Sequence, residues 1–107
     1  MEMKRVVITG LGALTPIGNN VNEYWQGLIN GVSGAAPITH FDATTAKTTF
    51  ACEVKNFDGG AYFDRKEIRK YDRFSQYGIV AAEQAIQDSG LDVEKIEKDY
   101  AGVIWAS

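Results

Sequence analysis

The stretch RVVITGLGALTPIG, residues 5–18, gives the first indication of the fold class of this chain. Residues 6–9 are β-branched throughout and end at Gly10, so they predict a short buried strand. Such a strand suits the middle of a parallel sheet that helices cover on both faces. The three glycines and Pro16 that follow predict a loop over residues 10–18. The chain therefore begins as an α/β fold.

Gly10-Leu11-Gly12 is also how a dinucleotide-binding turn begins, but two observations speak against such a site. The fingerprint G-x-G-x-x-G needs a third glycine, and this chain has Thr15 followed by Pro16 there. No strand ending in an acidic residue follows, and the phosphate-binding sequence Gly-Lys-Ser/Thr is missing. We therefore predict that Gly10 and Gly12 form a tight-packing turn and that the chain binds no cofactor.

Helical segments follow this loop. A helix is predicted over residues 22–30, with Asn20 or Asn22 as its N-cap and Gly31 after its end. Residues 65–71 predict a short charged turn or helix, and residues 92–99 an acidic, helical surface segment. The clearest helix begins after the cap Asp72 and ends before Gly90, because apolar residues recur there at spacings of three and four. Four small residues on its face allow a neighbour to pack very closely: Gly78, Ala81, Ala82 and Ala85.

Two further strands are predicted. Residues 48–54 alternate, with Phe50, Cys52 and Val54 on one side, which is typical of a half-buried strand that is antiparallel or at a sheet edge. Residues 101–107 are another buried-strand run. A parallel strand at that position needs a covering helix after it. We therefore expect residues 1–107 to be a truncated portion of one larger domain, with no complete domain boundary inside the chain.

Composition limits the partners and the compartment. The net charge of −3 gives the molecule no electrostatic reason to bind nucleic acid or an anionic membrane. No apolar stretch approaches the roughly 18–20 residues that span a bilayer. The single cysteine, Cys52, excludes an intramolecular disulfide and fits a reducing compartment. We expect a soluble, cytoplasmic protein.

Cys52, His40 and Asp42 supply the residue types of a nucleophile, a base and an orienting acid. The position of Cys52 between Phe50 and Val54 favours instead a buried, structural thiol. One histidine and one cysteine without ligand spacing predict no metal site. The sequence therefore assigns no catalytic residue to this chain.

The best local signal is RKEIRKYDR, residues 65–73. Lys66, Arg69, Lys70 and Arg73 recur at i, i+3, i+4 and i+7, so a continuous helix would place them on one face. A basic face on a net-acidic protein is a candidate docking patch for an acidic partner or a phosphate group. The alternative is a solvated helix face, which is what most charge runs form.

Taken together, several stretches resemble the N-terminal quarter of β-ketoacyl-acyl-carrier-protein synthases. They are, in order, RVVITGLGALTPIGNNV, HFD, RKEIRKYDRFSQYGIVAAEQAIQDSGL and GVIWAS. The resemblance covers essentially the whole chain. Within the family, the chain most resembles the type II condensing enzyme of bacterial fatty-acid synthesis.

The resemblance implies a thiolase-like fold, in which two α/β halves form five αβαβα layers, and a homodimer. It also implies a decarboxylating Claisen condensation that uses a nucleophilic cysteine and two histidines, none of which matches a position in this chain. Lys66, Arg69 and Lys70 match the basic residues that dock the acidic acyl carrier protein, whereas Arg73 is left unassigned. A non-catalytic ketosynthase-like protein or a stand-alone docking module remains an alternative, and a nicotinamide-binding domain is a weak third. The choice between fatty-acid and polyketide synthesis stays open.

Overall fold

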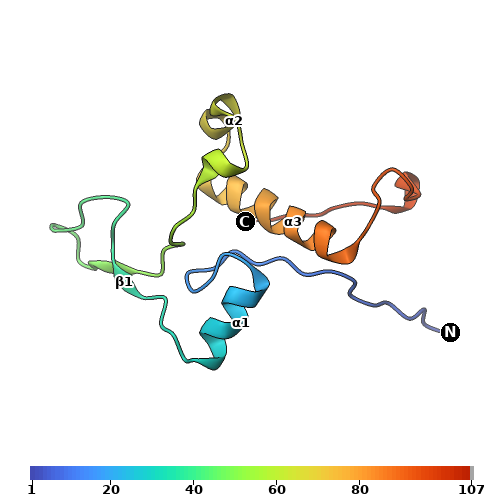
Figure 1. Cartoon of the computed structure of the whole chain (residues 1–107), viewed down its shortest axis with the longest axis horizontal. Helices are drawn as coiled ribbons and strands as arrows, with labels where there is room; N and C mark the ends of the chain where they lie inside the picture. The colour runs from blue at the N-terminus through green and yellow to red at the C-terminus, as the bar shows by residue number, and fades with distance from the viewer. Residues whose placement is uncertain (107) are drawn as a thin grey trace.

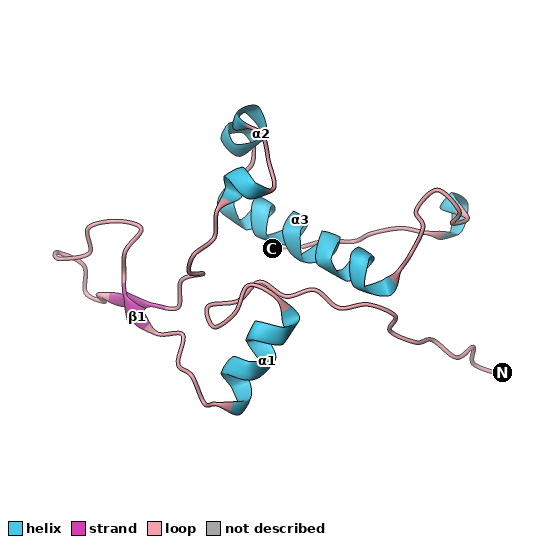
Figure 2. Ribbon diagram, viewed as in Figure 1, coloured by secondary structure: helices cyan, strands magenta, loops and turns pink. Residues whose placement is uncertain are grey.

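The computed structural model describes residues 1–106, which contain three α-helices and long loops (Figures 1 and 2); only two residues separate the second helix from the third. The helices are α1 (Val21–Ile29), α2 (Arg65–Lys70) and α3 (Arg73–Ser89). Two short strands, β1 (Ala36–Pro37) and β2 (Phe50–Ala51), and two 3-10 turns, η1 (Gly59–Ala61) and η2 (Lys98–Tyr100), complete the elements. The three helices lie within one or two residues of the segments that the sequence predicts.

Local signals explain where the long helices begin and end. The Asn20 side chain accepts a hydrogen bond of 2.9 Å from the Glu23 amide, so Asn20 rather than Asn22 caps α1. Gly31 and Gly90 follow the ends of α1 and α3 with φ angles of +64° and +67°. Glycine reaches this left-handed region at no steric cost, which is why both helices stop there.

The loop over residues 10–18 lies between α1 and α3 (Figure 1). A Cβ atom added at Gly12 would collide with the carbonyl oxygen of Ala81, and one at Gly10 would lie 2.6 Å from the Ser89 nitrogen. The predicted tight-packing turn is therefore confirmed. Its partner is the face of α3 with small side chains, so the glycines serve close packing of loop on helix.

Side chains of α3 also hold this loop by hydrogen bonds. The Leu11 amide donates to Asp88 Oδ2 over 2.9 Å, and the Ala13 amide donates to Gln84 Oε1 over 3.1 Å. Gln84 Nε2 donates in turn to the Asn19 carbonyl over 2.8 Å. Two amides of the loop and the carbonyl that follows it thus find their partners on one helix.

The predicted strands are mostly wrong for the described residues. Residues 6–9 and 101–106 pair with no strand, and Ser107 lies outside the described residues. Only Phe50–Ala51 of the predicted strand 48–54 is confirmed, in an antiparallel pair with Ala36–Pro37. The physical reason is that a strand exists only when a neighbour pairs with its backbone, and residues 1–106 offer the terminal segments none.

Two further expectations need correction. Cys52 is exposed, and Phe50 beside it is 62% exposed, so the thiol is not buried on an apolar strand face. Residues 92–99 form no α-helix; the 3-10 turn Lys98–Tyr100 is the helical structure there.

The molecule has an open shape, with extents of 56 × 38 × 27 Å and a radius of gyration of 17.4 Å. A compact chain of this length has a radius of gyration of roughly 13 Å. Val80 of α3, at 1% exposure, is the largest fully buried side chain in the described part. Residues 1–106 thus combine helices with a two-stranded sheet, and the five-layer arrangement stays an expectation. No described helix is both long and apolar enough to cross a membrane.

Candidate docking surface

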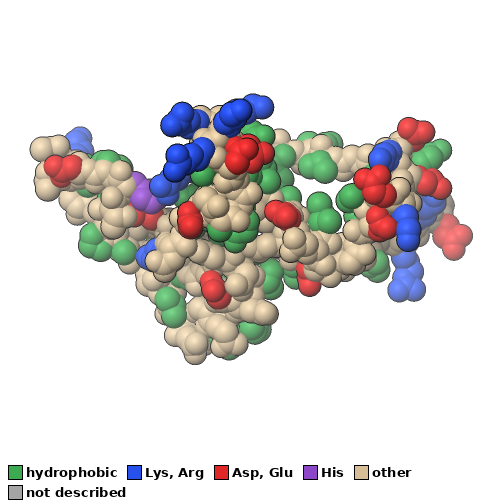
Figure 3. Space-filling view, turned by 45° about the horizontal axis from the view of Figure 1, so that its top comes forward, with side chains coloured by type: hydrophobic (Ala, Val, Ile, Leu, Met, Phe, Trp, Pro, Cys, Tyr) green, Lys and Arg blue, Asp and Glu red, His purple; other side chains and the backbone are tan. Residues whose placement is uncertain are grey.

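The three cations that the sequence singles out, Lys66, Arg69 and Lys70, all lie on α2 and are exposed. We call these three residues the docking surface. Lysine and arginine side chains gather over α2 in the space-filling view (Figure 3). Within residues 1–106, none of the three forms an ion pair. Their charges are therefore free to attract an anionic partner.

A capping box defines the first turn of α2. Asp64 Oδ1 accepts hydrogen bonds of 2.8 Å from the amides of Lys66 and Glu67. Glu67 Oε2 accepts one of 3.1 Å from the Asp64 amide. These reciprocal bonds satisfy backbone donors that a helix start leaves open, and they offset the small size of a six-residue helix.

The C-terminal end of α2 rests on aromatic side chains. Lys70 Nζ lies 5.6 Å from the centre of the Tyr71 ring, a cation–π contact. Tyr71 in turn packs edge-on against Phe63 with ring centres 5.9 Å apart. Arg69 and Lys70 also lie in the last turn, where the helix dipole favours positive charge. Two of the three cations thus gain local stabilisation from their position.

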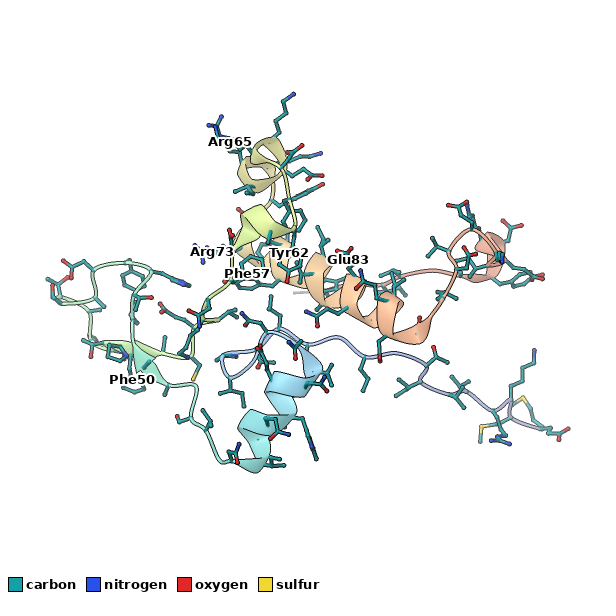
Figure 4. All side chains as sticks on the ribbon, in the orientation of Figure 1. Phe50, Phe57, Tyr62, Arg65, Arg73 and Glu83 are labelled. Carbon is teal, nitrogen blue, oxygen red and sulfur yellow. The ribbon has the colours of Figure 1, made fainter. Side chains whose placement is uncertain are left out.

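Arg73 does not share the face of α2. The chain becomes extended at Tyr71, with φ −101° and ψ 128°, so the helix breaks between Lys70 and Arg73. Arg65 lies on α2, whereas Arg73 lies beside Phe57 at the start of α3 (Figure 4). The predicted single face over residues 66–73 is therefore wrong, because it requires one continuous helix.

The possible triad of Cys52, His40 and Asp42 is not assembled. His40 Nδ1 lies 3.6 Å from Glu53 Oε1, and the Asp42 carboxylate accepts a hydrogen bond of 3.1 Å from the Thr44 amide. His40 and Asp42 thus each have a partner outside the triad. Among residues 1–106, no three His, Cys, Asp or Glu side chains are grouped so as to hold a metal ion.

Glu53 is the most heavily bonded carboxylate of this region. Desolvation raises its pKa, but hydrogen bonds from Thr39 and from the His40 amide, with the nearby imidazole, outweigh it and hold the pKa below its usual range. The Thr39 hydroxyl donates to Glu53 Oε2 over 2.8 Å. The arrangement ties the segment that follows β1 to the segment that follows β2.

Sequence reasoning missed two polar side chains that organise the loops. Lys55 Nζ donates to three backbone carbonyls, those of Pro16 at 3.1 Å, Gly34 at 2.8 Å and Glu53 at 3.2 Å. Gln76, only 6% exposed, donates from Nε2 to the Tyr71 carbonyl over 3.0 Å. Gln76 lies within a stretch quoted for the resemblance and Lys55 does not, but no local pattern predicts the carbonyl partners of either side chain.

An apolar groove of about 410 Å³ runs along α3 on another side of the helix. Phe74, Ile79 and Val103 line it, and the Trp105 ring covers Gly78. A Cβ atom added at Gly78 would lie 3.1 Å from this ring. The small residue at this position thus admits the indole, which packs the C-terminal segment on α3.

Comparison with known proteins gives a consistent result. Residues 3–107 match the family model described as "Beta-ketoacyl synthase, N-terminal domain". The chain is 48% identical over 104 residues to 3-oxoacyl-[acyl-carrier-protein] synthase 2 of Synechocystis sp., covering 97% of this chain and 25% of the relative. The synthase of the same name from Coxiella burnetii is also 48% identical, with 96% and 25% covered. The chain thus spans about a quarter of the length of these curated relatives.

Two solved structures are similar as well. The ishigamide ketosynthase/chain length factor superposes with a TM-score of 0.74 at 39% identity, over 84% of this chain and 22% of that one. A type II PKS acyl-carrier protein in complex with its ketosynthase bound to the hexaketide gives a TM-score of 0.67 at 36% identity, over 90% and 25%. Both similarities extend over most of the described chain.

Proposed function

The chain belongs to the β-ketoacyl synthase family, and we propose that it forms the N-terminal part of a 3-oxoacyl-[acyl-carrier-protein] synthase. Residues 1–107 would then be one portion of a thiolase-like domain with five αβαβα layers. The match of the family model over residues 3–107 carries this proposal. The 48% identity to synthases of that name supports it further.

The reaction of such an enzyme is a decarboxylating Claisen condensation in fatty-acid synthesis. An acyl group is held as a thioester on a cysteine, and malonyl-carrier protein loses CO₂. The carbon freed by that loss attacks the acyl carbonyl, so a carbon–carbon bond forms while the carbon–sulfur bond breaks. We assign none of the required cysteine and two histidines to this chain, since Cys52 and His40 match neither role. Their place lies in the remainder of a homodimeric, cytoplasmic enzyme.

Within that enzyme, we propose that the docking surface binds acyl carrier protein. Three exposed cations without ion pairs on a capped helix suit an acidic partner, because opposite charges speed and orient association. The similarity to a ketosynthase that was solved in complex with its acyl-carrier protein supports the same partner.

Charge reversal in the native gene product tests this function. The double substitution Lys66→Glu, Arg69→Glu should raise the KM for malonyl-carrier protein strongly and leave kcat nearly unchanged, because it removes docking and not chemistry. The same reversal at Lys95 and Lys98, which are 85% and 70% exposed, is the matched control for net charge. An equal effect of both pairs would remove the docking surface from the proposed function. Absence of any condensation activity in the native gene product would overturn the proposal that it is a synthase.

A non-catalytic ketosynthase relative is the second candidate. The 39% identity to a structure that includes a chain length factor favours keeping it. Such a protein would bind carrier protein through the same cations and catalyse no condensation. Labelling of the native gene product with a thiol-directed acyl analogue separates the two, because only the synthase holds a reactive cysteine.

A further inference from the structure

We propose that Gln76 is a positioning residue that holds α2, and with it the docking surface, at a defined angle on α3. The proposal rests on the docking function proposed above. Gln76 lies in the first turn of α3 and is one of the few buried polar side chains of the described chain, at 6% exposure. A buried amide is retained only where its hydrogen bonds are made.

The bond that Gln76 makes is directed at the end of α2. Its Nε2 donates over 3.0 Å to the carbonyl oxygen of Tyr71, the residue that follows α2 and ends it. The bond joins the last turn of α2 to the first turn of α3 across the extended break. It therefore restrains the direction in which the chain leaves Lys70.

The other end of the same amide contacts η1. A Cβ atom added at Gly59 would lie 2.7 Å from Gln76 Oε1 and 3.8 Å from Cγ1 of Ile68 on α2. Glycine at this position thus allows η1 to approach both helices. The buried Gln76 side chain thus lies where α3, η1 and the end of α2 meet, below the docking surface.

This hydrogen bond from Gln76 matters because few other contacts hold α2 on α3. An isolated helix of six residues is unstable, since nucleation costs more than its few hydrogen bonds return. The capping box stabilises its first turn locally but does not link it to α3. At the other end, Gln76 provides the link to α3, while the Phe63–Tyr71 contact joins the residues that flank α2.

The substitution Gln76→Met in the native gene product tests the proposal, because it keeps the length of the side chain and removes its donor. We expect the affinity for holo acyl carrier protein, measured by calorimetry, to fall roughly five-fold, the worth of one hydrogen bond. Gln84→Met is the matched control. Gln84 lies on the same helix and makes two hydrogen bonds, to Ala13 and Asn19, but none to α2. It should lower the melting temperature and leave the affinity unchanged.

Three outcomes would decide against the positioning role. An unchanged affinity in Gln76→Met, with loss of binding in Lys66→Glu, Arg69→Glu, overturns the proposal and leaves docking intact. An equal loss of affinity in Gln76→Met and Gln84→Met shows general destabilisation and also overturns it. Full affinity in the charge-reversed variant overturns docking and the role of Gln76 together.

The substitution Gln76→Glu adds a second measurement, the pH dependence of the affinity for acyl carrier protein. A change in stability alone would not alter this dependence. The introduced carboxyl group can donate to the Tyr71 carbonyl only when it is protonated, and the carboxylate would repel that oxygen. Burial raises the pKa of such a group, while Arg73 and Asp58, which line the same pocket, shift it in opposite directions. The affinity relative to the unsubstituted protein, taken at each pH, should therefore improve as the pH falls. A ratio that is constant with pH would contradict the proposal.

Discussion

At the scale of single residues, the glycines of the opening stretch act through the space they leave free. Gly12 faces the carbonyl oxygen of Ala81, which leaves no room for a methyl group. Its φ angle does not lie in the left-handed region, so the requirement for glycine is steric. Glycines at these positions could suggest a phosphate-binding turn. Here they allow the loop to pack closely on a helix.

Gly12→Ala should therefore destabilise the native gene product by about 1–3 kcal/mol, the usual cost of overpacking. Urea unfolding would measure it. Gly12→Val, which places a larger side chain against the same carbonyl oxygen, should destabilise the protein further. Unchanged stability in both variants would contradict the close approach of loop and helix.

Glu53 allows a prediction about pH at the same scale. Its pKa lies below the ordinary value of 4.5 in the folded chain. A carboxyl with a lowered pKa contributes stability above its unfolded pKa and loses it as the pH falls through the folded one. Thr39→Val removes the hydroxyl donor, so the pKa of Glu53, followed by NMR titration, should rise. Thr44→Val, whose hydroxyl acts on Asp42, should leave it in place.

At the scale of elements, α2 depends on its N-terminal capping box. Asp64 bonds two amides of the first turn, while Asp72 makes no side-chain capping bond to α3. The two aspartates hold equivalent N-cap positions, but only Asp64 stabilises its helix by side-chain hydrogen bonds. The longer helix needs no such cap, because its buried face supplies the stability.

Asp64→Ala should destabilise α2 by about 1 kcal/mol, the typical worth of an N-cap. The protection of the Tyr71 amide, which donates to Glu67 at the end of α2, should then fall about five-fold in hydrogen exchange. Asp72→Ala should change the protection of α3 amides far less. Similar losses in the two variants would argue against a specific role of the capping box.

At the scale of the whole molecule, apolar segments at both ends lie open. Val6, Ile8, Val103 and Ile104 are each at least 83% exposed. Unpaired backbone next to such side chains favours edge-to-edge association. The open shape and the unpaired ends have one cause, which is that nothing within residues 1–106 pairs with them.

We therefore expect the isolated chain 1–107 to be marginally stable or to aggregate. It should bind a hydrophobic dye and show no cooperative thermal transition, as measured by fluorescence and calorimetry. A sharp, reversible transition of a monomer would contradict this expectation.

Local sequence patterns were enough to place the three α-helices and the tight turn and to indicate the family, although they also predicted a helix over residues 92–99 that does not form. Helix ends are local properties: the capping residues Asn20 and Asp64 and the stop at Gly90 act on neighbours within one turn. The three cations of the docking surface were likewise visible as a pattern of charge. Their role stays a prediction that the charge-reversal experiment tests.

Other features became visible only in the folded chain, because they depend on how its elements pack. The tertiary structure separated Arg73 from the cations of α2, exposed Cys52 and left the terminal strand segments unpaired. It also gave Gln76 its carbonyl partner across the break between the helices. Strand pairing and buried hydrogen bonds join residues whose closeness no local pattern encodes, whereas a helix closes its bonds within itself.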